Sequence, residues 1–122
     1  MTKREFERLV EGVLESLPAD FRSRLDNVEV EVQTRPSEEI LDEMGVPEDE
    51  TLFGLYQGTP LTDRHEGELP RMPDRILIFQ EPIEEACVGR REIEQEVRRT
   101  VIHEVAHFFG IDEDRLQDLG LD

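Results

Sequence analysis

The pattern His-Glu-x-x-His at residues 103–107 constrains the fold of this chain more than any other stretch. On an α-helix, residues four apart lie about 40° apart around the axis and about 6 Å apart along it. This spacing turns the imidazoles of His103 and His107 to one side, where both can bind one Zn²⁺. Glu104 then lies beside the ion, where it can take a proton from a water that the ion acidifies. The pattern predicts a metal site with two histidine ligands and Glu104 as general base.

The residues around this pattern predict a helix over 90–109. Apolar residues recur three and four positions apart and form one stripe, made up of Ile93, Val97, Val101, Val105 and Phe108. The two histidines, preceded by Glu96 and Thr100, form a second stripe about 160–200° away. One face is therefore expected to pack while the other carries chemistry, and Gly110 is expected to end the helix.

A catalytic zinc takes three protein ligands and leaves its fourth position to water. Fifteen residues follow His107, so a ligand from a distant downstream helix is not expected. The third ligand should come from residues 111–122 or from upstream of the helix. Gly110 can turn the backbone so that the next residues approach the metal.

Three consecutive carboxylates after Gly110 are the candidates for this third ligand. Glu113 is favoured because it lies ten residues after His103, where H-E-x-x-H-x-x-G-x-x-H enzymes place their third histidine. Asp112 and Asp114 remain alternatives. Each could instead occupy the first turn of a short helix over 112–119, where the helix dipole favours negative charge.

Charge and composition limit the partners. A chain of 122 residues is long enough for one core, so we expect a single domain over 1–122. The 31 acidic and 14 basic residues give a formal net charge of −17, which repels nucleic acid and anionic membrane surfaces. We therefore expect neither as a partner, and the sequence does not fix the oligomeric state.

Cysteine use and hydropathy predict a cytoplasmic protein. Cys87 is the single cysteine and cannot form an intramolecular disulfide, which fits a reducing compartment. No apolar run approaches the length of a membrane span, and the N-terminal stretch lacks the apolar segment of a signal peptide.

The rest of the chain alternates predicted helices, strands and one long loop. Thr2 and Glu5 form a capping box ahead of an amphipathic helix that ends before Pro18. Further along, we expect strands over 27–33, 51–57 and 75–80. The last of these is apolar on both faces and should be a covered, central strand. We also expect a short helix capped by Ser37, a loop over 58–74 that contains His65, and an ion pair between Glu94 and Arg98. Gly54, inside the second strand, predicts a bulge or a close approach of another backbone.

Three stretches together resemble a known family, the minimal zincin-like metallopeptidases of bacteria and archaea. They are 54–62 (GLYQGTPLT), 73–79 (PDRILIF) and 101–120 (VIHEVAHFFGIDEDRLQDLG). The resemblance implies a small α+β zincin-like fold, in which a few-stranded sheet packs against an N-terminal helix and the H-E-x-x-H helix. It also implies zinc held by His103, His107 and the acidic residue three past the glycine, with Glu104 as base. That acidic position is usually Asp in the family and is Glu113 here.

The leading functional prediction is a zinc-dependent peptidase that cleaves peptides or small proteins with Glu104 as general base. The strand over 51–57, or the loop that follows it, is expected to align the substrate by β-augmentation. Tyr56 or Arg115 could stabilise the oxyanion, with a structural role as the favoured alternative for each. Two alternatives are a metal-binding domain without activity, with His65 or Asp112 completing a closed zinc site, and an acidic partner-binding protein.

Overall fold

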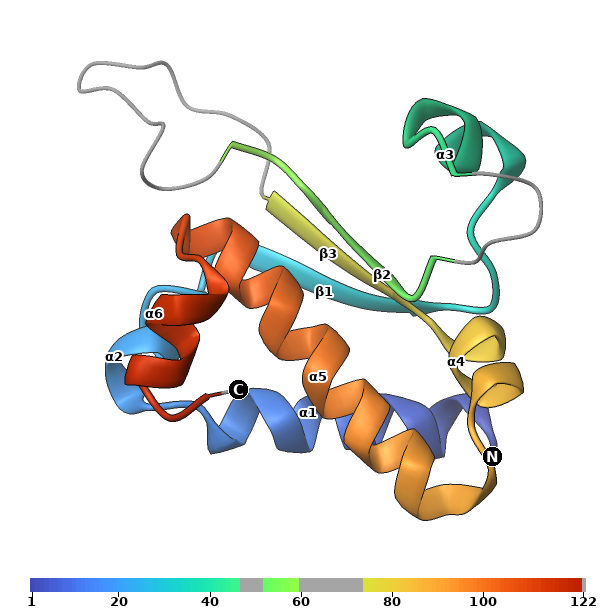
Figure 1. Cartoon of the computed structure of the whole chain (residues 1–122), viewed down its shortest axis with the longest axis horizontal. Helices are drawn as coiled ribbons and strands as arrows, with labels where there is room; N and C mark the ends of the chain where they lie inside the picture. The colour runs from blue at the N-terminus through green and yellow to red at the C-terminus, as the bar shows by residue number, and fades with distance from the viewer. Residues whose placement is uncertain (47–51, 60–73, 122) are drawn as a thin grey trace.

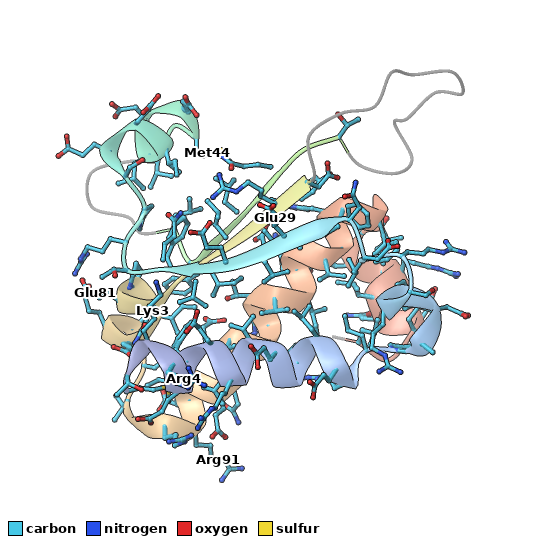
Figure 2. The ribbon with its side chains drawn as sticks, turned by 180° about the vertical axis from the view of Figure 1, so that it is seen from behind. Lys3, Arg4, Glu29, Met44, Glu81 and Arg91 are labelled. Atoms are coloured by element: carbon cyan, nitrogen blue, oxygen red, sulfur yellow. The ribbon has the colours of Figure 1, made fainter. Side chains whose placement is uncertain are left out.

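A computed structural model of the chain describes residues 1–46, 52–59 and 74–121. The elements in chain order are α1 (Lys3–Ser16), α2 (Ala19–Arg22), β1 (Val28–Gln33), α3 (Glu38–Glu43), β2 (Gly54–Gln57), β3 (Asp74–Phe79), α4 (Gln80–Ala86), α5 (Gly89–Phe109) and α6 (Glu113–Asp118). Helices α1 and α5 cover one face of a small sheet, and α3 lies on the other side (Figures 1 and 2). The predicted α+β class is confirmed.

The sheet is mixed, with strand order β1-β3-β2. β3 runs parallel to β1 and antiparallel to β2, so β2 forms one edge. The predicted central, covered strand is confirmed, because β3 buries side chains on both faces. Ile76 and Ile78 belong to the main core beneath the helices, whereas Leu77 and Phe79 belong to a smaller cluster with Leu55 on the opposite face.

The main core joins α1, the sheet and α5. α1 begins as predicted, since the Glu5 N–H donates to Thr2 Oγ1 at 3.1 Å, and its apolar stripe buries Phe6 and Val10. The predicted apolar stripe of α5 is also confirmed, with four of its members between 0% and 5% exposed: Val97, Val101, Val105 and Phe108. Burial of these two stripes against the sheet fixes the direction of α5.

Two local predictions were wrong. Gln80 starts α4 instead of ending β3, and its side-chain amide donates to Glu84 Oε1 at 2.9 Å. Glu94 pairs with Arg90 one turn earlier, at 3.1 Å, instead of with Arg98. Arg98 instead donates to the hydroxyl of Ser16 at 3.4 Å, because α1 packs alongside α5 and offers a partner from outside the helix.

Some predictions fall on residues outside the described ranges. They include His65, most of the loop over 58–74, and Thr51. The predicted strand over 51–57 was too long at its start, because Leu52 and Phe53 are described and precede β2. The single domain over 1–122 also stays a prediction. Among the helices described here, none has the length and apolar character required to cross a bilayer.

Gly54 lies where side chains of α5 press against β2, and the backbone carbonyl of Leu77 in β3 is also close, 3.2 Å from a Cβ placed at this position. A Cβ at this position would lie 2.7 Å from Thr100 Cγ2 and 3.2 Å from Glu104 Cγ. We expect Gly54→Ala to lower the free energy of unfolding by about 1–3 kcal/mol, because the added methyl overpacks this contact. Urea denaturation of both proteins measures the difference.

Gly12→Ala in α1 is the matched control, because a Cβ there meets no atom within 4 Å. Alanine has the higher helix propensity, so this variant should gain up to about 1 kcal/mol. A Gly54→Ala variant as stable as the wild type would contradict the close contact.

Candidate metal centre

Helix α5 presents the residues of the predicted site on its last turns. Its apolar face is buried against α1 and the sheet, which leaves His103 and His107 exposed on the opposite side. Glu104 lies between these faces and is only 5% exposed. The helix ends at Gly110, whose φ of 70° is left-handed, and the Ile111 N–H donates back to the Ala106 carbonyl at 3.0 Å. The sharp turn directs the chain into α6.

The structure brings three of the four predicted site residues together. One potential ligand atom from each of His103, Glu104 and His107 lies within 4.8 Å of the other two. The imidazole centroids of the two histidines are 4.5 Å apart, and His107 Nδ1 lies 3.2 Å from Glu104 Oε1. Five consecutive residues thus supply two exposed imidazoles and one buried carboxylate at a single point.

The Glu104 side chain lies beside β2. The Phe53 carbonyl accepts from the Phe79 N–H, so the backbone groups of Leu55 also face β3 and those of Tyr56 face away from it. The Tyr56 N–H donates to the Glu104 carboxylate. Burial raises the pKa of Glu104, and the nearby His103 and this hydrogen bond oppose the rise.

Tyr56 is fixed in turn by contacts on its other side. Its hydroxyl donates to Asp74 Oδ2 at 2.6 Å, and its ring packs edge-on against Phe108, with centroids 6.0 Å apart. Asp74 is 3% exposed, and a Cβ on Gly58 would lie 2.5 Å from its carboxyl group. A role for Asp74 was not predicted from the sequence. The sequence features that could have indicated one are an acidic residue at the start of an apolar strand and a glycine at the end of the strand that pairs with it.

The three candidate third ligands occupy different places around the start of α6. Asp112 is the helix N-cap and accepts from the Arg115 N–H at 2.9 Å. Asp114 is exposed in the first turn. Glu113 is also exposed and lines a cavity that His103 lines too, although it lies outside the group of three whose ligand atoms converge. Glu113 as third ligand therefore stays a prediction.

The chemistry of this group fits zinc. Imidazole nitrogens and carboxylate oxygens are among the common zinc ligands in proteins, and catalytic sites keep one coordination position open. The two imidazoles are exposed, so an ion between them has room for water and substrate. Because Nδ1 of His107 faces Glu104, we expect Nε2 to be the nitrogen that binds the ion.

A comparison with known protein families agrees with the family resemblance of the sequence. The sequence model of the zincin-like metallopeptidases matches residues 25–121, which is most of the chain. The chain therefore belongs to the zincin-like metallopeptidase family, as the resemblance implied.

A solved structure shares the fold. A conserved hypothetical protein from Thermus thermophilus is 25% identical, with a TM-score of 0.59 over 98% of this chain and 97% of that one. No curated protein matches the chain.

The buried carboxylate of Glu104 makes a testable contribution to stability. In the unfolded chain its pKa is near 4.5, and in the folded chain it is higher. Between these values the folded state binds more protons, so the free energy of unfolding falls as pH rises. We expect metal-free Glu104→Gln to be more stable than the metal-free wild type at pH 7, with the difference shrinking toward pH 4.

Urea denaturation in a chelator, at several pH values, measures this difference. Glu11→Gln, on the exposed side of α1, removes a charge without touching a buried group and is the control. A Glu104→Gln protein that is less stable than the wild type at pH 7 would show that the buried charge of Glu104 does not destabilise the fold.

Proposed function

We propose that this chain is a zinc-dependent peptidase in which Glu104 is the general base. The main support for this proposal is that the exposed imidazoles of His103 and His107 lie close to the buried carboxylate of Glu104. A zinc ion bound by the histidines would polarise the scissile carbonyl and acidify the attacking water. Glu104 would accept the proton of that water and pass it to the leaving amine.

The position of Glu104 suits this role. Its carboxylate is oriented by the Tyr56 N–H and by the His107 ring, so it cannot swing freely into solvent. A base held in one place needs no reorganisation when the proton moves. Burial also raises its affinity for a proton above that of an exposed glutamate.

Glu113 is the third ligand in this proposal. It is the candidate that lines a cavity together with His103, whereas the side chain of Asp112 already caps α6. The turn at Gly110 brings the start of α6 alongside the end of α5 (Figure 1). A structural zinc site would instead be closed by four protein ligands, and the exposure of both histidines favours a catalytic site.

The edge of β2 is the proposed place for the substrate backbone. β2 is an edge strand among the strands that the structure describes, and the backbone groups of Tyr56 point away from β3, toward Glu104. A peptide that adds to this edge in an extended conformation would pass beside the general base. A crystal complex of zinc-loaded Glu104→Gln with a long peptide tests this, and a peptide bound away from β2 would contradict it.

Metal content tests the ligands. Elemental analysis of untagged wild-type protein should give about one zinc per chain. His107→Ala and Glu113→Ala should lose the metal, and Glu104→Gln should keep it. His65→Ala and Asp114→Ala are the matched controls and should also keep it. Retention in Glu113→Ala would move the third ligand to a neighbouring carboxylate, and a wild type without zinc after reconstitution would contradict the site.

Hydrolysis of a randomised peptide library tests the catalytic role. Zinc-loaded wild type should cleave the library, with products identified by mass spectrometry. Glu104→Gln with full zinc content should be slower by about 10²–10⁴-fold, because the general base is lost while the metal remains. Equal rates for the two zinc-loaded proteins would contradict Glu104 as base.

A further inference from the structure

A cavity of about 350 Å³ lies between the exposed face of α5 and helix α6. His103 and Glu113 line it, so it adjoins the proposed metal site directly. Its volume is at the lower end of the range of about 300–1,000 Å³ found for small-molecule sites. A cavity of this size beside the metal has room for one substrate side chain.

The walls of this cavity divide into an apolar part and a basic part. Three buried side chains, between 4% and 9% exposed, supply the apolar part: Ile102, Leu116 and Leu121. Arg98 and Arg99 supply the basic part from one turn of α5 ahead of His103, and both are exposed. The complementary side chain has an apolar stem and an anionic end.

We propose that this cavity binds an acidic side chain of the peptide substrate next to the scissile bond, with Arg98 and Arg99 holding its carboxylate. The inference rests on the proposed peptidase function and names the class of its substrate. Ile102 and Leu116 contact the methylenes of the bound side chain, so glutamate fits better than a shorter acid.

The present contacts of the two arginines leave them able to take a carboxylate. Arg98 Nη1 lies 3.4 Å from the neutral hydroxyl of Ser16, which is a long hydrogen bond. Arg99 Nη1 lies 3.6 Å from Glu96 Oε1, and the Arg99 side chain is 77% exposed whereas that of Glu96 is 18% exposed. An ion pair of this length with its arginine in solvent contributes little, whereas a guanidinium holds a carboxylate through two parallel hydrogen bonds.

Two electrostatic effects oppose the binding of an acidic side chain. Glu113 lines the same cavity, and in the proposed function its carboxylate binds the metal. The net charge of −17 also repels an acidic peptide at long range. At an ionic strength of about 0.15 M the Debye length is about 8 Å, so distant repulsion is screened and the contacts inside the cavity decide the preference.

Binding to a protein that keeps its zinc but lacks its base tests the inference independently of catalysis. The probes are two fluorescein-labelled pools of hexapeptides, with glutamate or glutamine fixed at one central position and uncharged residues elsewhere. Zinc-loaded Glu104→Gln should bind the glutamate pool about tenfold more tightly, as expected for charge-assisted hydrogen bonds. Adding Arg98→Gln and Arg99→Gln should abolish this preference.

Arg90→Gln with Arg91→Gln, in the same Glu104→Gln background, is the matched control. It removes the same charge from the first turn of α5, and Figure 2 shows Arg91 projecting from this end of the helix, away from α6. The glutamate preference should survive in this control. Equal binding of the two pools, or a preference that persists without Arg98 and Arg99, would overturn the inference.

Cleavage of the same pools by the wild type separates the two proposals. Hydrolysis of both pools at equal rates would leave the peptidase function in place and overturn the acidic specificity. A glutamate preference in binding without hydrolysis of either pool would support the cavity and contradict the peptidase function.

Discussion

The candidate metal site depends on the contact between α5 and β2. Gly54 allows the helix to approach until Thr100 and Glu104 lie against the strand. At this separation the Tyr56 N–H reaches the Glu104 carboxylate, while the histidines one position before and three after it face outward. One packing contact thus sets both the burial of the base and the exposure of the ligands.

This arrangement lowers stability where it supports chemistry. A carboxylate that is almost fully buried loses solvation, and one backbone hydrogen bond and a nearby imidazole offset only part of that loss. The fold compensates with the apolar contacts of α1, α5 and β3 beneath the site. Asp74 supports the site in a similar way. Its buried carboxylate accepts a hydrogen bond from the Tyr56 hydroxyl and thereby holds the Tyr56 side chain in place.

Regular periodicity allowed much of the fold to be predicted from the sequence. The buried faces of α1 and α5 could be predicted from their apolar stripes, and those of β3 from its apolar residues on both faces. The spacing of His103 and His107 predicted that both lie on one side of a helix. Contacts between distant segments have no such period. Three such contacts depend on how the elements pack against one another. They are the hydrogen bond from the Tyr56 N–H to Glu104, the hydrogen bond from the Tyr56 hydroxyl to Asp74, and the contact of Arg98 with Ser16. A sequence pattern therefore predicts which residues share a face, but not which partner the neighbouring element supplies.

In the proposed function, zinc lies between His103, His107 and Glu113 with one side open to substrate. Anomalous diffraction from crystals of the zinc-loaded wild type locates the ion without assuming its ligands. We expect one peak, about 2.0–2.2 Å from a nitrogen of each histidine and an oxygen of Glu113, with the fourth position facing solvent and Glu104 beside it. A peak held by other residues, or enclosed by four protein ligands, would contradict it.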